Sequence, residues 1–296
     1  MTTDGPDAPY RDFLMPENLV GHARAWLEDS SGEPVVPKPS ATVMLLRDTG
    51  QTAAALEVFV LRRTSTMPFA PGAVVFPGGG VDARDADPGV PWAGPTAQEW
   101  ASTLHTDEVA ARELVIAAAR EVFEECGVLL AGPDQDSVVA DLTDPAWDRE
   151  RDELLAREQS FGELLIRRRL VLRSDLLQAR AHWITPEAEP RRYTTRFFAA
   201  RMPEGQRADD RTSEAVRADW VTPQQALADF AAGRERMLPP TVQMLEHLTA
   251  APSVEALLAT PVPLWPVMPW PVEHSDQMWM RAPIDAAGHG IRPRTT

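Results

Sequence analysis

The sequence predicts an α+β fold with a mixed β-sheet, and three observations support this prediction. Segments rich in branched and aromatic residues, which are typical of strands, lie on both sides of a long helical pattern, without regular alternation of strands and crossover helices. Hydrophobic residues make up 44% and charged residues 25% of the 296 residues, which is enough apolar material for a core. The 28 prolines, roughly twice the usual share, predict long structured loops.

The N-terminal part is predicted to contain an irregular leader followed by strands. Residues 1–35 form the leader, with one short helix over residues 16–29. Three strands are expected, at residues 41–48, 55–63 and 72–79. Residues 83–105 are rich in Asp, Pro and Gly and are expected to form an insertion loop.

A long helix and a further helical segment are predicted next. The helix covers residues 108–126, with Thr106 as its N-cap and Gly127 as the residue that ends it. Residues 130–180 are expected to be mostly helical, with a capping-box pattern at residues 160–163.

The last third of the chain is predicted to return to strands before two helices and a tail. Strands are expected over residues 191–202 and 217–221. A helix begins after Thr222, its N-cap, and a last helix covers residues 238–250. Residues 261–296 are too rich in proline for a helix, so we expect an extended tail that wraps the core.

Charge and composition restrict the partners and the compartment. The net charge of −15 argues against a general nucleic-acid binder, and an anionic substrate would need metal cations or a local arginine patch. The first residues lack the apolar region of a signal peptide, and the apolar runs are too short to span a membrane. One cysteine, Cys126, cannot form an internal disulfide. We therefore expect a cytoplasmic protein without a membrane or nucleic-acid partner.

Three glutamates crowd one side of the predicted long helix. Glu121, Glu124 and Glu125 follow the i, i+3, i+4 spacing that places side chains on one helical face. One interpretation is a solvated acidic face, because like charges at this spacing cost only a few tenths of a kcal/mol. The other is a metal site. The acids lie at the C-terminal end of the helix, where the dipole disfavours them, and hard divalent cations prefer such oxygen ligands.

The context of these glutamates resembles the Nudix box of the Nudix hydrolases, G-x5-E-x7-R-E-U-x-E-E-x-G-U, in which U is a bulky apolar residue. Gly79 matches the first glycine. The second half matches at Arg120, Glu121, Val122, Glu124, Glu125, Gly127 and Val128. The resemblance implies a Nudix α/β/α sandwich over residues 36–250, between the leader and a Pro/Trp-rich extension at residues 251–296.

The same resemblance implies the roles of the matched residues. Glu121, Glu124 and Glu125 would ligate Mg²⁺ or Mn²⁺, with help from the carbonyl of Gly79. Arg120 would orient the glutamates, so that Arg120, Glu124 and Glu125 are the expected catalytic residues of the box.

The chain departs from the family pattern between the two halves of the box. About 40 residues separate Gly79 from Arg120, where the family has a short loop. The loop glutamate expected eight residues before the arginine is replaced by Arg112. It is open whether Glu113, one place off, substitutes for it.

Long insertions at this point occur in one branch of the family, the coenzyme A and acyl-coenzyme A diphosphatases, which this chain resembles over residues 38–250. Residues 61–79 partly match the coenzyme A motif of such enzymes, although Pro68 stands where a second arginine belongs. The resemblance implies coenzyme A as the substrate, with Arg63 and Gly78 as substrate-binding residues.

Two further assignments leave alternatives open. Glu214 is either a catalytic or metal-binding loop acid, as in some Nudix enzymes, or a solvated loop residue. Arg191, Arg192 and Arg196 are candidates for binding substrate phosphates, because arginine matches phosphate geometry in bidentate fashion. At least two of these three are expected to be ordinary surface charges, and Arg196 is the one assigned to the substrate.

The predicted function is divalent-metal-dependent hydrolysis of a diphosphate bond in a nucleoside-diphosphate-linked metabolite, with coenzyme A or acyl-coenzyme A as first choice. Other substrates in view are ADP-ribose, NADH and dinucleoside polyphosphates. A different class is a non-catalytic module that senses a nucleotide, against which the three intact glutamates argue. The protein is expected to act on this small molecule as a monomer or homodimer.

Overall fold

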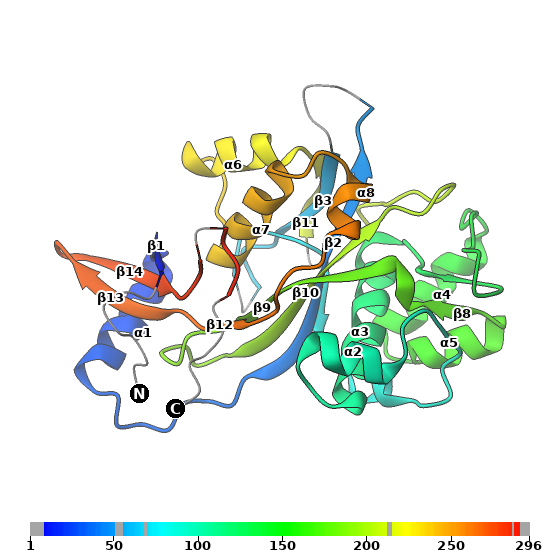
Figure 1. Cartoon of the computed structure of the whole chain (residues 1–296), viewed down its shortest axis with the longest axis horizontal. Helices are drawn as coiled ribbons and strands as arrows, with labels where there is room; N and C mark the ends of the chain where they lie inside the picture. The colour runs from blue at the N-terminus through cyan, green and yellow to red at the C-terminus, as the bar shows by residue number, and fades with distance from the viewer. Residues whose placement is uncertain (1–8, 51–55, 68–69, 212–214, 286, 291–296) are drawn as a thin grey trace.

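A mixed β-sheet forms the centre of the computed structural model, which describes residues 9–50, 56–67, 70–211, 215–285 and 287–290 (Figure 1). The strand order is β11–β3–β2–β10–β9–β12, with β4 paired to β3 and β5 paired to β2. The bounds of these strands are β2 Lys38–Asp48, β3 Leu56–Arg63, β4 Val74–Val75, β5 Gly78–Gly80, β9 Leu177–Ile184, β10 Tyr193–Arg201, β11 Ala215–Val221 and β12 Pro266–Val267. Strand β2 runs parallel to β10 and antiparallel to β3. The predicted mixed sheet is therefore confirmed.

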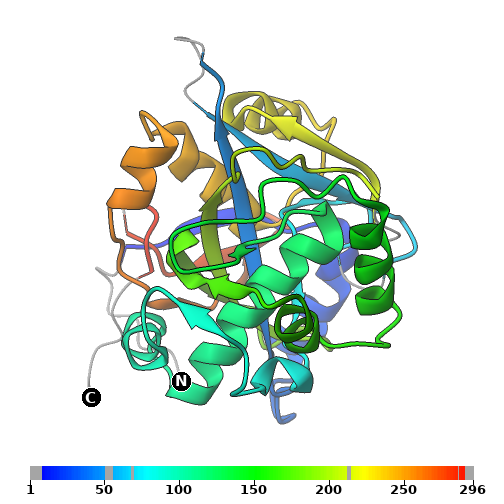
Figure 2. The ribbon, with the colours of Figure 1, turned by 90° about the vertical axis from the view of Figure 1, so that its right-hand side faces the viewer.

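Helices cover both faces of this sheet. One face carries α2 (Ala97–Leu104), α3 (Glu108–Cys126), α4 (Pro145–Leu155) and α5 (Phe161–Arg168), and Figure 2 shows them gathered in front of β2. The other face carries α6 (Pro223–Ala231), α7 (Pro239–Thr249) and α8 (Val254–Ala259).

Successive side chains of β2 alternate between the two faces. Val43 and Leu45 belong to the apolar cluster that contains α3, whereas Met44 and Leu46 belong to the cluster that contains α7. All four are at most 1% exposed, because the strand is covered on both sides. The arrangement is the α/β/α sandwich that the family resemblance implied.

Helix α3 lies against the centre of the sheet and has the predicted bounds. Its N-cap is Asp107, whose Oδ1 accepts a hydrogen bond from the backbone N–H of Ala110 at 2.9 Å, so the assignment to Thr106 was one residue early. Gly127 ends the helix as predicted, with φ +68° in the left-handed region.

The insertion between the two halves of the box is more regular than a loop. Residues 83–105 contain a 3₁₀ turn, η1 (Ala83–Ala86), the short strand β6 (Trp92–Ala93) and helix α2. Helix α2 begins with a capping box, in which Thr96 and Glu99 bond each other's backbone N–H. That T-x-x-E pattern was available in the sequence, and the prediction of a loop overlooked it.

The segment after α3 is only partly helical. Helices α4 and α5 are present, and Ser160 and Glu163 form the predicted capping box. However, β7 (Ala131–Gly132) and β8 (Val171–Arg173) pair with each other, and β8 also pairs with β6 of the insertion. Strand β9 of the central sheet begins at Leu177, so the prediction of helix up to residue 180 was wrong at this end. Pairing between distant segments decides β7 and β8, and no local pattern encodes it.

The leader and the tail pair with each other. Strand β1 (Arg11–Leu14) lies against β14 (Gln277–Ala282), which in turn pairs with β13 (Trp270–His274). The predicted leader helix is α1 (Glu17–Glu28). Strand β12 of the tail adds an edge to the central sheet, so the tail is extended and packs on the core, as expected.

Candidate functional site

Arg120 is the centre of a buried cluster of carboxylates. It is 7% exposed and lies in the last two turns of α3. Its Nη1 donates to Glu121 Oε1 at 2.8 Å and to Glu124 Oε2 at 2.9 Å, and its Nε donates to Asp85 Oδ1 at 3.0 Å. Its Nη2 donates to the carbonyl of Gly80 at 2.8 Å. The guanidinium thus holds two predicted metal ligands and the glycine strand in one arrangement.

The electrostatics of this cluster follow from its burial. Burial alone would lower the pKa of Arg120, but the charges of Glu121 and Asp85 raise it well above its ordinary value. Burial raises the pKa of Glu124, against the opposing effect of Arg120. The arginine therefore stays charged and offsets the mutual repulsion of the acids that surround it.

Asp85 is the residue that sequence reasoning missed. It is 2% exposed, lies in η1 and bonds Arg120 through both carboxylate oxygens. Counting forward from Gly79, Asp85 occupies the acidic position of G-x5-E, and the insertion follows it. The count backwards from Arg120 crossed the insertion and led to Arg112 and Glu113. The structure places Asp85, not Glu113, against the arginine.

The glycines of β5 bring the backbone against the glutamates. The backbone N–H of Gly78 donates to Glu125 Oε2 at 2.7 Å. A Cβ on Gly79 would lie 2.5 Å from Glu121 Oε1, and one on Gly78 would lie 2.4 Å from the carbonyl oxygen of Ala41. A side chain at position 78 would collide with the backbone of β2, so this position requires glycine, whereas one at position 79 would displace the carboxylate of Glu121.

A second arginine covers the C-terminal end of α3. Arg151 of α4 is 2% exposed and donates from Nε to the carbonyl oxygen of Glu124 at 2.8 Å. It also forms an ion pair with Asp209 at 2.7 Å. Acidic side chains at the C-terminal end of a helix interact unfavourably with the helix dipole, whereas a cation there interacts favourably. Arg151 therefore offsets the unfavourable position of the glutamates. Arg151 had no signal in the sequence, because α4 is distant from α3 along the chain.

The donor set of the cluster fits a hard divalent cation. Carboxylate and carbonyl oxygens from Glu121, Glu124, Glu125 and Gly79 are the ligands that Mg²⁺ and Mn²⁺ prefer. The backbone of Gly79 lies so close to the carboxylate of Glu121 that a Cβ on Gly79 would collide with it. In the described residues, no three acidic, histidine or cysteine side chains converge on one point as an ion would require. The carboxylates of Glu121 and Glu124 bond Arg120 instead.

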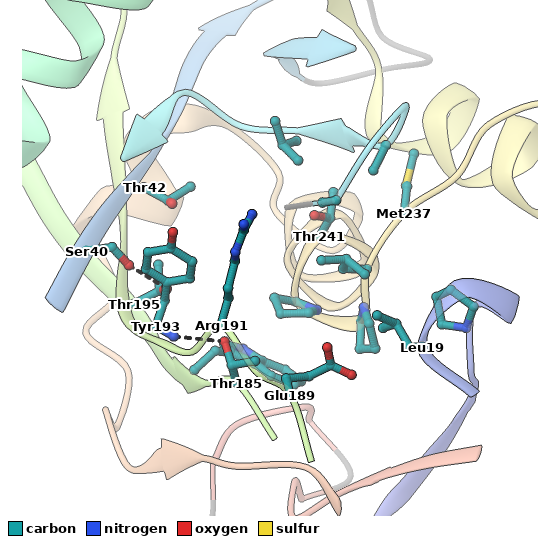
Figure 3. Close-up of a pocket in the computed structure, with 18 of the residues that line it drawn as sticks. Leu19, Ser40, Thr42, Thr185, Glu189, Arg191, Tyr193, Thr195, Met237 and Thr241 are labelled. Carbon is teal, nitrogen blue, oxygen red and sulfur yellow. Dashed lines mark hydrogen bonds between the residues drawn. The ribbon is translucent and has the colours of Figure 1, made fainter. Parts of the chain in front are cut away.

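The glycine strand also forms one side of a large cavity of about 840 Å³ (Figure 3). Gly78, Gly79 and Gly80 line it, and they pair with Thr42, Ala41 and Ser40 of β2. The carboxylate cluster is therefore at the border of a space large enough for a metabolite-sized ligand.

Among the described residues, three arginines line this cavity, in contrast to the acidic character of the whole chain. They are Arg63 at the end of β3, Arg191 before β10, and Arg236 before α7. Figure 3 shows the guanidinium of Arg191 reaching into the middle of the space. In the described part of the lining there is one carboxylate, that of Glu189, which faces His22 at 3.4 Å. The lining of the cavity is thus cationic enough to attract an anionic ligand.

The other two arginines of the predicted group, Arg192 and Arg196, bond backbone carbonyl oxygens. Arg192 donates to the carbonyl oxygens of Thr185 and Val35. Arg196 is 7% exposed and donates to the carbonyl oxygen of Leu104 at 3.0 Å. Burial lowers the pKa of Arg196 to about 10. Its assignment to the substrate is not supported by this position, because its guanidinium is bonded to α2 rather than to the cavity.

Two positions that the sequence singled out lie outside the described residues. These are Glu214, the candidate loop acid, and Pro68, which stands in place of a motif arginine. Next to Glu214, Ala215 pairs with Arg63, a lining residue of the cavity. None of the helices in the described part of the chain combines the length and apolar character that crossing a bilayer requires.

Comparison with known proteins adds independent findings. The family profile of the NUDT19 Nudix domain matches residues 95–248. A protein of Caenorhabditis elegans, named “Putative nudix hydrolase 7”, is 29% identical over 201 residues, covering 65% of this chain and 55% of its own. The acyl-coenzyme A diphosphatase NUDT19 of Xenopus laevis is 26% identical over 231 residues, covering 65% of this chain and 59% of its own. This chain therefore aligns with less than two thirds of either relative.

A similar fold is found among solved structures. The crystal structure of a NUDIX hydrolase from Alicyclobacillus acidocaldarius superposes with a TM-score of 0.65 and 26% identity. The superposition covers 78% of this chain and 99% of that chain. The fold is thus shared with that protein over nearly its full length.

Proposed function

Because the chain belongs to the NUDT19 Nudix domain family, we propose that it is a divalent-metal-dependent hydrolase of nucleoside-diphosphate-linked metabolites, with coenzyme A or acyl-coenzyme A as the favoured substrate. The observation that carries this proposal is the junction of two features at β5. The carboxylate cluster around Arg120 lies on one side of the glycines, and the arginine-lined cavity lies on the other. A diphosphate in that cavity would lie next to the metal ligands of the family.

The residues of the cluster have distinct proposed roles. Glu121, Glu124 and Glu125, with the carbonyl of Gly79, would hold the divalent cation. When bound, this cation neutralises the diphosphate and lowers the pKa of a water molecule. Arg120 keeps the carboxylates in place, because it bonds two of them together with Asp85.

Other residues would bind the substrate and accept a proton. Arg63 and Arg191 reach the cavity and would bind its phosphates, so Arg191 is the structural candidate for the arginine that Pro68 replaces in the motif. Gly78 lines the same space and remains a proposed substrate contact. Glu214 remains the proposed proton acceptor, since its neighbour Ala215 is paired with Arg63.

The choice of coenzyme A rests on the partial motif around Arg63 and on the relative from Xenopus laevis, whose name states acyl-coenzyme A diphosphatase activity. ADP-ribose, NADH, dinucleoside polyphosphates and a non-catalytic sensor module remain the alternatives. The number of cationic side chains supports coenzyme A, because its 3′-phosphate brings charge beyond the diphosphate.

The test is a product assay with a substrate panel. The purified full chain is incubated with Mg²⁺ or Mn²⁺ and with coenzyme A, dephospho-coenzyme A, ADP-ribose, NADH and diadenosine tetraphosphate, and products are separated by chromatography. We expect 3′,5′-adenosine diphosphate from coenzyme A and loss of its formation in EDTA. Preference for ADP-ribose or NADH would contradict the substrate assignment, and binding without any turnover would indicate the sensor module.

A further inference from the structure

The N-terminal end of helix α7 faces the cavity. Residues 238–241, which are the N-cap and the first three residues of the helix, all line it. The N-cap is Leu238, which offers no side-chain hydrogen bond to this end of the helix, and the next two residues are prolines without a backbone N–H. The helix dipole favours an anion here. Such an anion would need its hydrogen-bond donors from side chains.

Thr241 offers a hydroxyl donor at this place. The residue is 5% exposed, yet its Oγ1 has no hydrogen-bond partner in the described part of the chain. Thr249, at the other end of α7, donates instead to the carbonyl oxygen of Leu245 at 2.9 Å, as threonines within helices often do. Figure 3 shows the hydroxyl of Thr241 on the cavity side of the helix, towards the guanidinium of Arg191. Because a buried hydroxyl without a partner is unfavourable, a ligand that accepts its hydrogen bond would be stabilised.

Two arginines of the cavity lining add positive charge to this end. Arg236 lies in the segment just before α7, and its carbonyl oxygen accepts a hydrogen bond from the N–H of Val74 at 2.8 Å. Neither Arg191 nor Arg236 forms an ion pair or a side-chain hydrogen bond with another of the described residues. The neighbouring Arg234, by contrast, is paired with Asp229. The guanidinium groups of Arg191 and Arg236 are therefore available to a ligand.

This end of the cavity is separate from the carboxylate cluster. Figure 3 shows Ser40 and Thr42 of β2 across the cavity from Thr241, with Arg191 between them. The glycines of β5, which border the carboxylate cluster, pair with β2 at these two residues. A ligand whose diphosphate lies at β5 would therefore reach the start of α7 with a different group.

We propose that the start of α7 is a second anion site, which binds a terminal phosphate dianion. Thr241 Oγ1 would donate to one phosphate oxygen, and Arg191 and Arg236 would bind the others. A dianion with three terminal oxygens accepts bonds from several directions, which suits one hydroxyl and two guanidinium groups. The phosphate is either a monoester that the substrate carries apart from its diphosphate, or inorganic phosphate. This inference deepens the proposed function and rests on it only for the diphosphate at β5.

The experiment measures dissociation constants by calorimetry at pH 8 in EDTA, where the phosphate is a dianion and turnover is not needed. Coenzyme A and dephospho-coenzyme A differ by one monoester phosphate, and inorganic phosphate presents this group alone. Thr241→Val removes the hydroxyl at similar shape, and Thr241→Ser retains it. Arg236→Gln is compared with Arg234→Gln, since Arg234 does not line the cavity. Thermal unfolding identifies variants that fail to fold, and the exposed position of Arg236 keeps the test open if Thr241→Val is one of them.

For the wild type, we expect coenzyme A to bind roughly tenfold or more tightly than dephospho-coenzyme A. Arg236→Gln should remove most of this preference, and Thr241→Val should reduce it roughly fivefold. Thr241→Ser and Arg234→Gln should keep it within about twofold. Affinity for dephospho-coenzyme A should stay within about twofold in every variant.

Inorganic phosphate distinguishes the two sources of the ligand. If the substrate carries the phosphate, added phosphate competes with coenzyme A and not with dephospho-coenzyme A. If both compounds bind equally but phosphate binds, and Arg236→Gln weakens phosphate binding at least fivefold, the site stands with free phosphate as its ligand.

Two results would overturn the inference. One is a wild type that shows neither a preference for coenzyme A nor binding of phosphate. The other is a preference and a phosphate affinity that both persist in Thr241→Val and Arg236→Gln. Hydrolysis with Mg²⁺, measured on the same samples, tests the proposed function separately. Turnover without phosphate recognition removes the site alone, whereas phosphate recognition without turnover of any substrate removes the proposed function alone.

Discussion

The two sides of the cavity are built from the chain in opposite ways. The carboxylate side is concentrated in one helix, where Arg120, Glu121, Glu124 and Glu125 lie within six residues, and Asp85 and the glycines of β5 join it from one further segment. Another part of the cavity lining comes from α1, the start of α7 and β14, which are more than 200 residues apart at their extremes. The comparison indicates that the proposed metal site is encoded locally, whereas the shape of the cavity depends on how distant parts of the chain meet.

The strongest way to break the carboxylate side is to neutralise one acid. Glu124→Gln or Glu125→Gln should keep the fold and lower kcat by two orders of magnitude or more, because each removes a proposed metal ligand and its share of transition-state stabilisation. Glu113→Gln, the same change on the same helix, is the matched control and should retain activity. Near-normal turnover of Glu124→Gln or Glu125→Gln at saturating Mg²⁺ would contradict the metal assignment.

A smaller effect is expected when the support of Arg120 is weakened. Asp85→Asn removes the charge that anchors the guanidinium and should reduce metal affinity or activity roughly 10- to 100-fold, as outer partners of metal ligands do. The half-saturating Mg²⁺ concentration is the readout, and Asp85→Glu should restore most of it, because the family motif has glutamate at this position. If Asp85→Asn leaves the Mg²⁺ dependence unchanged, Asp85 serves the fold alone.

Two adjacent arginines, Arg191 and Arg192, allow a matched test of substrate binding. Arg191→Ala should raise KM for coenzyme A roughly tenfold or more, since a charge-assisted bond to phosphate contributes about 1.5–3 kcal/mol. Arg192→Ala, next to it in the chain, should leave KM unchanged and lower the melting temperature, because Arg192 bonds the backbone of Thr185 and Val35. Equal KM values in steady-state kinetics of the two variants would remove Arg191 from the substrate site.

The smallest expected effect concerns the sheet that supports both sides. Burial lowers the pKa of His182 to about 3, with a further contribution from Arg196. The unfolded chain has a histidine pKa near 6.5, so it binds more protons than the folded chain between about pH 6.5 and 3. The folded state therefore loses stability as the pH is lowered through that window. Between pH 7 and 5.5 the loss should be about 1 kcal/mol.

Urea unfolding at the two pH values measures this loss. His182→Gln should show less of it than the wild type, and His22→Gln, at an exposed position, should not reduce it. If His182→Gln loses as much stability between the two pH values as the wild type, groups other than His182 cause the loss.

Local patterns predicted a large part of the fold and of the site. The i, i+3, i+4 spacing and Gly127 predicted the glutamate helix and its end, and the capping box at Ser160 predicted the start of α5. The same kind of local pattern at Thr96 was overlooked, which is why α2 was expected to be a loop. Errors also arose where strands form by pairing with distant segments, as in β8, which pairs with β6 and β7.

The sequence by itself identified the candidate residues of the site, because the acids, the arginine and the glycines of the box need only helix spacing and motif order to be recognised. It did not determine which arginine reaches the cavity. Arg191 and Arg192 are neighbours of one type, and only the turn before β10 sends one into the space and the other into the backbone of Thr185. Nor did it determine that Leu19 and Met280 line the same cavity, since this depends on the pairing of β1 with β14. Helix spacing acts over a few residues, whereas such contacts form only once distant segments have been buried together.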